Sequence, residues 1–226
     1  MKALASLAKF TGRYDEWLDM VRRYRLKWSS PGKAIKVFRS IFDSQSDGKS
    51  LYSMVRWIRD VSATMPLEYR NVLLFNTLTG LRPDEAQKAI YLIKTMGDDY
   101  LDRDRLILKH YQFPRTFLRN TKNAYISVVN SNILEMAKHT PNKEHYYPSL
   151  RKKIEATRGF GMHMYYCRKV FATYLRTSGI EPEIIDLLQG RISSSVFVSH
   201  YYRPNINEII TNSIRPVLNS LLKELA

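Results

Sequence analysis

The stretch Thr-Gly-Leu-Arg-Pro-Asp-Glu-Ala at residues 79–86 joins a turn to the start of a helix. Pro83 stands where a first helical residue would be, because its ring presets φ and its missing N–H needs no partner there. Asp84 and Glu85 follow in the first turn, where the helix dipole favours acidic side chains. The pattern predicts that Arg82 is held at a helix entry, a position suited to binding an oxyanion. The alternative, from this stretch alone, is an ordinary surface arginine beside a helix cap.

Helices are predicted on both sides of this turn. Apolar residues recur at helical spacing before and after it, and glycines and prolines mark where the helices stop. The helix before the turn divides into two pieces around Pro66, and the last helix is expected to break near Pro216. The predicted helices of this part of the chain cover residues 51–79, 83–96, 131–138, 149–157, 168–178, 182–188, 193–202 and 209–222.

The pattern changes between residues 98 and 130, where short β-branched runs alternate with turn residues. Residues 106–108, 116–118 and 124–129 are predicted as strands of a small antiparallel sheet. The turn-rich run around Lys122 places this residue at a hairpin tip, where a lysine is usually only a solvated charge. The predicted fold class is therefore mainly α with a small antiparallel β-sheet.

The first 48 residues are predicted to form a separate helical segment. Helical spacing over residues 1–28 is interrupted near Gly12, a second helix is expected at 33–42, and residues 43–48 have the composition of a linker. About fifty residues are too few for an independent core. We therefore interpret this segment as the remnant of a larger domain.

The composition indicates a polyanionic partner. The chain has 226 residues, a hydrophobic fraction of 44%, which is ample for a core, and a formal net charge of +15. Nucleic acid fits this charge better than a membrane surface, and no apolar run approaches the length of a spanning helix. The single cysteine, Cys167, excludes an internal disulfide and suits a reducing intracellular compartment.

No metal and no cofactor are expected. The histidines are scattered and Cys167 is alone, so no zinc-ligand spacing appears, and there is no glycine-rich phosphate loop. The acidic cluster of Asp98, Asp99, Asp102 and Asp104 could suggest a two-metal nuclease. Its mixture with arginines in a connector favours a solvated loop instead.

Five motifs, in order, resemble those of the tyrosine recombinase (phage integrase) family. Residues 79–86 resemble its first arginine box, and Arg-Lys-Val-Phe-Ala-Thr at 168–173 resembles its second. Gln-Gly-Arg at 189–191 occupies the place of the family's Leu-Gly-His. Thr-Lys at 121–122 matches the catalytic lysine on its hairpin. Tyr201 follows at about the distance of the nucleophile, one residue beyond the commonest spacing.

The agreement in order and spacing covers residues 60–204. Within the family, Arg191 and the run Val-Phe-Val-Ser-His-Tyr at 196–201 look most like integrases of archaeal spindle-shaped viruses (fuselloviruses). The resemblance implies a recombinase catalytic domain with a C-terminal assembly helix over residues 49–226. It also implies that residues 1–48 are the last part of a core-binding (clamp) domain.

The same resemblance implies where the chain acts and with what. The expected partner is double-stranded DNA carrying attachment sites, bound by a tetramer of this chain in the host cytoplasm, at the nucleoid. The apolar face of Leu218, Leu221 and Leu222 is expected to dock on a neighbouring protomer. No membrane partner is expected.

The implied reaction is cleavage and rejoining of DNA strands, which integrates a viral or plasmid genome into a host chromosome. Tyr201 would attack a phosphodiester, forming a 3′-phosphotyrosyl link and freeing a 5′-hydroxyl. Arg82 and Arg168 would offer planar donor forks to the non-bridging oxygens. Lys122 would protonate the departing oxygen. Arg191 can donate where the family usually has histidine, but it cannot act as a base.

Two tyrosines complicate this assignment. Tyr165 stands three residues before Arg168, where the family has histidine or lysine, and its unperturbed pKa of about 10 makes it a poor base although it can hydrogen-bond a phosphate. His163 would point elsewhere on a regular helix, so the acceptor of the Tyr201 proton is unassigned. The resemblance favours Tyr201 over Tyr202 as the nucleophile.

Two other functions remain open from the sequence. A type IB topoisomerase shares the phosphotyrosine chemistry and would relax any supercoiled plasmid. A non-catalytic DNA-binding protein with the same fold would bind DNA in a salt-sensitive manner and form no covalent adduct.

Overall fold

The computed structural model describes residues 2–26, 34–35, 38, 50–119, 122–141, 146–158, 165–192 and 195–225. Contacts between residues divide the chain into two compact units, residues 1–50 and residues 51–226. The predicted linker at 43–48 and most of the predicted helix at 33–42 lie outside the described residues. Among the residues that are described, no helix is both long and apolar enough to span a membrane.

Residues 2–26 of the first unit form two short helices, α1 (Lys2–Phe10) and α2 (Tyr14–Arg23). The chain turns between them at Gly12, whose φ of 69° lies in the left-handed region that glycine adopts without strain. The interruption predicted near Gly12 is therefore confirmed. Trp17 of α2 is buried, whereas Phe10 is 90% exposed. The interpretation of this segment as the remnant of a clamp domain stays a prediction.

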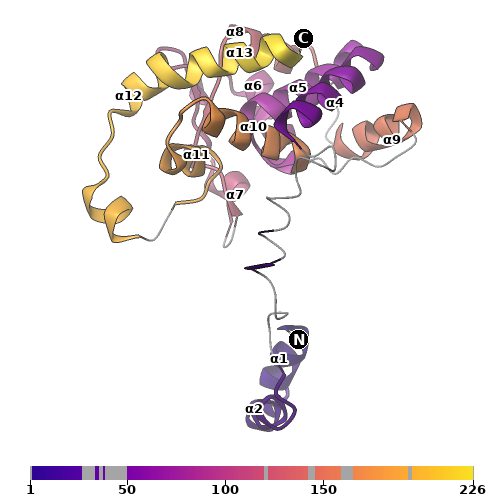
Figure 1. The fold of residues 1–226 in the computed structure, drawn as a ribbon, viewed down its shortest axis with the longest axis vertical. Coiled ribbons are helices and arrows are strands. Elements are labelled where there is room, and N and C mark those ends of the chain that lie inside the picture. Colours follow the sequence, from indigo (N-terminus) through magenta and orange to yellow (C-terminus); the bar gives the residue numbers. More distant parts are fainter. Residues whose placement is uncertain are drawn as a thin grey trace. The chain divides into compact units, whose positions relative to one another are not determined.

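The second unit is mainly helical, with small antiparallel sheets (Figure 1). Its helices are α4 (Leu51–Thr64), α5 (Leu67–Thr79), α6 (Pro83–Thr95), α7 (Pro114–Phe117), α8 (Ser131–Lys138), α9 (Tyr146–Arg158), α10 (Tyr165–Thr177), α11 (Pro182–Leu188), α12 (Ile206–Ile209) and α13 (Arg215–Leu225). Its strands are β1 (Leu101–Asp102), β2 (Ile107–Leu108), β3 (Leu118–Arg119), β4 (Lys122–Asn123) and β5 (Ser127–Val128). Short 3-10 turns, η2 (Gly97–Asp99) and η3 (His110–Gln112), and π-helical turns, η4 (Phe197–Tyr201) and η5 (Ile210–Ile214), complete it. The predicted fold class is confirmed in this coarse form.

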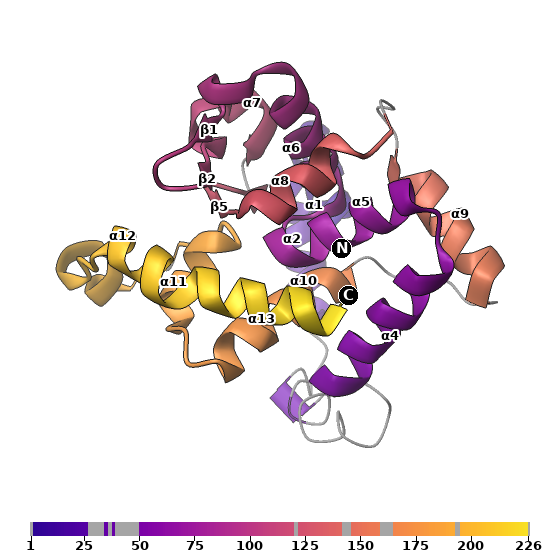
Figure 2. The same ribbon diagram turned by 90° about the horizontal axis from the view of Figure 1, so that it is seen from above.

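Helix α5 is the centre of the second unit. Every residue from Asn71 to Thr79 is buried, as expected of a helix that is covered on all sides. It contacts α4, α6, α8, α9, α10 and α13, which are arranged around it in Figure 2. The chain breaks between α4 and α5 at Pro66, as predicted.

The turn that ends α5 requires a glycine. Gly80 caps the helix with a φ of 62°, and a Cβ added there would come within 2.3 Å of the Phe171 ring on α10. Arg82 follows as the N-cap of α6, and Pro83 is the first residue of that helix. The helix entry predicted from residues 79–86 is therefore confirmed.

The strands between α6 and α8 form two antiparallel sheets. Strands pair in the order β1-β2-β5, and β3 pairs with β4 as a separate hairpin. The prediction of a strand at 116–118 is wrong in its first part. Pro114 starts the short helix α7, because proline suits a first helical position, and the strand begins only at Leu118. The strand predicted at 124–129 shortens to β5.

The C-terminal segment continues as a helix past Pro216 instead of breaking there. Proline lacks the N–H that would bond four residues back and crowds the carbonyl at that position. The π-helical turn η5, immediately before α13, accommodates this change. The apolar side of α13 packs on α4 and α5 of the same chain, where Leu218 and Leu221 are buried and Leu222 is partly buried. This face thus packs within the chain in the structure, and its docking on a neighbouring protomer stays a prediction.

A buried chain of hydrogen bonds joins η3 to the three-stranded sheet. The Tyr100 hydroxyl lies 2.6 Å from Nδ1 of His110, and Nε2 of His110 lies 2.8 Å from Oγ of Ser127. All three side chains are buried. Burial lowers the pKa of His110 to about 3, so the imidazole is neutral in the folded protein at pH 7.

We expect Leu221→Ala to lower the free energy of unfolding by about 2–5 kcal/mol, because truncation of a fully buried leucine loses apolar burial and leaves a cavity. Lys223→Ala, at an exposed position of the same helix, is the control and should change that energy by no more than about 0.5 kcal/mol. Urea denaturation followed by circular dichroism measures both. Equal effects of the two substitutions would contradict the packing of α13 on its own chain.

We also expect the folded state to lose stability as the pH falls below about 6.5. In the unfolded chain His110 takes up a proton with a pKa of about 6.5, whereas in the folded protein it stays neutral down to about pH 3. The unfolded state therefore binds the extra proton, which weakens folding by about 2 kcal/mol between pH 7 and pH 5. Denaturation of the protein and of His110→Gln at both pH values measures this contribution.

The matched control is His200→Gln, which replaces an exposed histidine. His200→Gln should show the same change in the free energy of unfolding between pH 7 and pH 5 as the unaltered protein. In His110→Gln this change should be smaller by about 2 kcal/mol. If His110→Gln kept the full dependence, the assignment of a neutral buried imidazole would be wrong.

Candidate active site

Arg82 is held by a buried carboxylate at the entry of α6. Its backbone N–H donates to Oε2 of Glu85 (2.9 Å) and its Nη1 donates to Oε1 of Glu85 (2.7 Å). Nη1 also donates to the Asn123 carbonyl on β4 (3.1 Å). Glu85 is 1% exposed and accepts a further bond from Arg119, so two guanidinium groups balance one buried negative charge. The orientation of Arg82 is therefore set by the fold before any ligand binds.

Arg168 lies between the C-terminal ends of two helices. Its Nη1 donates to the carbonyl of Gly80, the C-cap of α5, and its Nη2 donates to the carbonyl of Gln189, the C-cap of α11. The Gln189 side-chain amide donates back to the Arg168 carbonyl (2.9 Å). The negative ends of two helix dipoles favour a cation at this place. Arg168 thereby joins the turn that leads to Arg82 with the turn that leads to Arg191.

The charges of the three predicted arginines act on one another. The pKa of Arg168 is lowered to about 10, first by burial and then by the positive charges of Arg82 and Arg191. Glu85 and Asp186 act in the opposite direction. Arg168 stays protonated at neutral pH. Residues predicted from three separate motifs are thus gathered into one cationic cluster.

The hairpin β3-β4 approaches this cluster at Gly190. A Cβ added to Gly190 would meet the Asn123 carbonyl oxygen at 1.6 Å, and the φ of 67° independently favours glycine. The same carbonyl accepts from Arg82. The backbone of Lys122, which precedes Asn123 in β4, is therefore next to both arginine-bearing turns.

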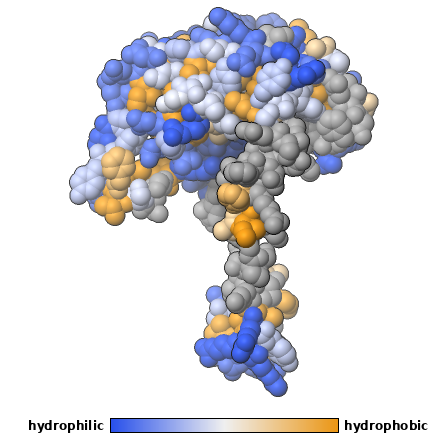
Figure 3. Space-filling model, viewed as in Figure 1, coloured by the Kyte–Doolittle hydropathy of each residue, from blue (hydrophilic) through white to orange (hydrophobic). Residues whose placement is uncertain are grey.

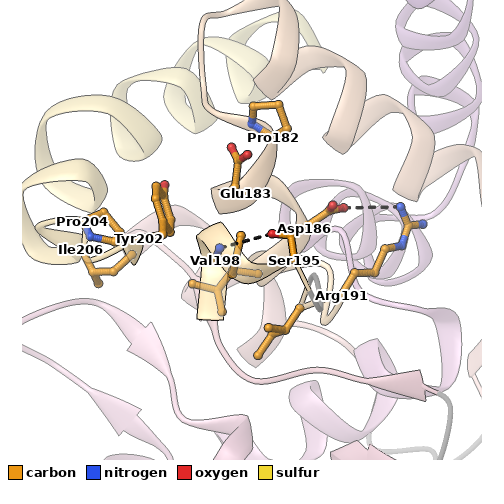
Figure 4. Close-up of a pocket in the computed structure, with 11 residues that line it drawn as sticks. Pro182, Glu183, Asp186, Arg191, Ser195, Val198, Tyr202, Pro204 and Ile206 are labelled. Atoms are coloured by element: carbon orange, nitrogen blue, oxygen red, sulfur yellow. Dashed lines mark hydrogen bonds and ion pairs between the residues drawn. The ribbon is translucent and has the colours of Figure 1, made fainter. Parts of the chain in front are cut away.

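Arg191 is the most accessible of the three arginines. It follows the turn at Gly190 and is ion-paired with Asp186 of α11, with 3.7 Å between Nη1 and Oδ1 (Figure 4). Its side chain is 60% exposed, against 22% for Arg82. An exposed ion pair contributes little to stability, so Arg191 can exchange Asp186 for another anion at small cost.

Tyr201 ends the π-helical turn η4, which lies at the edge of the second unit in Figures 1 and 2. It is 73% exposed, and within the described part of the chain its side chain makes no hydrogen bond or ring contact. Val196 and Phe197 of the same segment are also exposed, and Figure 3 shows hydrophobic side chains gathered there. The Tyr201 hydroxyl is accessible, and the structure does not bring it into contact with the arginine cluster.

Tyr202, in contrast, is engaged within the fold. Its hydroxyl donates to Oε2 of Glu181 (2.6 Å), and its ring lies 5.6 Å from that of Phe197. Burial and the neighbouring Glu181 carboxylate raise the pKa of Tyr202. It lines a cavity of about 330 Å³ between α11 and the η4 segment, together with Asp186 and Arg191 (Figure 4). Of the two adjacent tyrosines, Tyr201 has the available hydroxyl.

The remaining predicted residues are placed by their backbones alone. Tyr165 is the first residue of α10, and Lys122 is the first residue of β4, paired with Arg119. Their side chains, and all of His163, lie outside the described part of the chain. Asp98 is ion-paired with Arg103 at the surface, and no metal-binding group of side chains is found among the described residues.

Sequence reasoning missed the residues that hold the arginines in place. Glu85 was noted only as an acid in a first helical turn, and its spacing of three residues from Arg82 was the signal that the two could pair. The carbonyls of Asn123, Gly80 and Gln189 carry no sequence signal, because every residue has one.

We expect Gly190→Ala to destabilise the protein much more than Gly179→Ala. Both glycines have positive φ, which costs an alanine about 1–2 kcal/mol. A Cβ at Gly179 meets nothing within 4 Å, whereas one at Gly190 collides with the backbone of β4. Thermal and urea unfolding of both variants measure the difference. Similar losses would contradict the close approach of the hairpin to the cluster.

Comparisons of this chain with protein-family models, with curated proteins and with solved structures found no match.

Proposed function

We propose that this chain cleaves and rejoins DNA strands through a 3′-phosphotyrosyl intermediate, as a site-specific recombinase or integrase. The observation that carries the proposal is the gathering of Arg82, Arg168 and Arg191 beside the hairpin that bears Lys122. The net charge of +15 supports a polyanionic substrate. The order of the motifs supports the phosphotyrosine chemistry.

The arginine cluster is suited to a phosphodiester. A guanidinium has five N–H donors; Arg168 uses Nη1 and Nη2 for internal carbonyls, and Arg82 uses Nη1 for Glu85 and Asn123. The remaining donors are available to non-bridging oxygens, where charge develops as the phosphorus becomes five-coordinate. Loss of one preorganised donor of this kind raises a reaction barrier by about 3–4 kcal/mol.

The reaction then follows from the roles of the remaining residues. The Tyr201 oxygen bonds to phosphorus while its proton passes to water, which reaches this exposed hydroxyl. The bond from phosphorus to the 5′-oxygen breaks, and Lys122 gives that oxygen a proton. Arg191 adds positive charge, and Tyr165 offers a hydrogen bond to the phosphate. A 5′-hydroxyl of another strand reverses the step, so no high-energy cofactor is consumed.

The proposal extends to partners and location. Its substrate is double-stranded DNA with attachment sites, its assembly on DNA is a tetramer, and its place is the host cytoplasm at the nucleoid. The apolar face of α13 packs within the chain in the structure, and Leu222 there is only partly buried. The absence of contact between Tyr201 and the arginines favours one second candidate, a non-catalytic DNA-binding protein. A type IB topoisomerase-like activity uses the same chemistry without an attachment site.

We expect Tyr201→Phe to abolish covalent adducts with DNA, because phenylalanine lacks the attacking oxygen. The probe is a pool of nicked duplexes with a randomised segment, in which cleavage near the nick releases a short strand and traps the adduct. Low salt keeps the binding tight. Denaturing gels count adducts, mass spectrometry maps the modified tyrosine, and sequencing of the attached DNA identifies the cleaved phosphate.

The matched control is Tyr202→Phe, which removes the neighbouring hydroxyl and its bond to Glu181 and should still form adducts. Adducts that persist in Tyr201→Phe would refute the assigned nucleophile. Salt-sensitive binding without adducts by the unaltered protein would support the non-catalytic candidate. Relaxation of any supercoiled plasmid would support the topoisomerase-like activity.

A further inference from the structure

Arg119 is a basic residue of the candidate site that belongs to none of the five motifs. It lies on β3, where its backbone pairs with that of Lys122 across the hairpin. Its Nη2 donates to Oε1 of Glu85 at 3.2 Å, and the same oxygen accepts from Arg82 at 2.7 Å. One buried carboxylate therefore joins a residue of the hairpin to the arginine at the entry of α6.

Hydrogen bonds between described residues attach the hairpin to α6 at two points. The Asn123 carbonyl accepts from Arg82 at one, and Arg119 donates to Glu85 at the other. The Arg119 backbone N–H also donates to the Asn123 side chain at 3.0 Å. Each strand of the hairpin has only two residues, and so short a ladder is marginally stable without outside contacts. The bond from Arg119 to Glu85 is therefore one of the contacts that fix the hairpin and with it the backbone of Lys122.

We infer that Arg119 is a positioning residue, which holds the β3-β4 hairpin so that Lys122 can protonate the leaving 5′-oxygen. This inference rests on the proposed function. Arg119 is 40% exposed and donates to Glu85 through Nη2, while its backbone pairs with that of Lys122. Direct contact of Arg119 with the phosphate is the alternative that the experiment below tests.

A change of the leaving group distinguishes a defect in proton donation by Lys122 from a defect in phosphate binding. An alkoxide is a poor leaving group, so cleavage of an ordinary phosphodiester depends on the general acid. If sulfur replaces the bridging 5′-oxygen at the cleaved phosphate, the departing thiolate is stable without a proton, because thiols are far stronger acids than alcohols. A defect in proton donation is then relieved, whereas a defect in phosphate binding remains.

The experiment compares cleavage rates on two nicked duplexes that differ only in this atom, using the cleaved sequence identified from the randomised pool. Arg119→Ala should cleave the ordinary duplex about 100-fold more slowly than the unaltered protein and the sulfur-containing duplex at close to the unaltered rate. Arg115→Ala removes an exposed arginine four residues earlier, on α7, and should cleave both at the unaltered rate. Glu85→Gln loosens Arg82 as well, so it should slow both duplexes.

A second measurement does not depend on cleavage. Hydrogen exchange of peptides that span residues 118–125 should accelerate in Arg119→Ala and not in Arg115→Ala, and the melting temperature shows whether the whole domain stays folded. Equal slowing of Arg119→Ala on both duplexes, no slowing, or unchanged exchange in the hairpin would each overturn the inference while leaving the proposed function intact. An absence of adducts by the unaltered protein would overturn both.

Discussion

The second unit depends on a cation placed between two helix ends. Arg168 donates to the carbonyls of Gly80 and Gln189, which close α5 and α11. Removing a charge from water costs several kcal/mol unless hydrogen bonds replace the water, and here the unpaired carbonyls of two helices do so. These carbonyls in turn need donors, because a helix leaves its last four without partners. The Arg168 side chain therefore supplies donors to carbonyls at both helix ends, and these carbonyls replace the water around its charge. The same bonds hold two turns together that are distant in the sequence.

The same arrangement leaves an excess of positive charge. Glu85 balances Arg82 and Arg119 together, and Asp186 reaches Arg191 only at 3.7 Å. Burial, and after it repulsion from the positive charges of Arg82 and Arg191, lowers the pKa of Arg168. An anion placed among the arginines would relieve this repulsion. The repulsion in the empty site therefore contributes favourably to the free energy of anion binding. The stability of the empty site is correspondingly lower than that of a site with equal numbers of opposite charges.

Local chemistry made the boundaries of the main helices predictable from the sequence. Pro66, Gly80, Pro83 and Gly179 each determine a backbone conformation by themselves, and the helices begin or end beside them. The strands were less predictable, because each has only two residues and tertiary packing decides which part of a β-branched run pairs. The C-terminal apolar face was recognised, but its packing on α4 and α5 was not, since an amphipathic pattern is the same whether a helix packs within its chain or on another. In the site, the side chains of Arg82 and Arg168 were predictable from motifs, whereas the backbone carbonyls that hold them were not.

The π-helical turn before α13 has a consequence for the phase of the C-terminal helix. A π turn contains one more residue than the α-helical turn it replaces, and each residue advances an α-helix by about 100°. The extra residue in η5 thus determines the direction in which every later side chain of α13 points. Without it, Leu218, Leu221 and Leu225 would rotate off the core, and polar neighbours would take their places. The π-helical turn at residues 210–214 therefore determines which side of α13 faces the hydrophobic core.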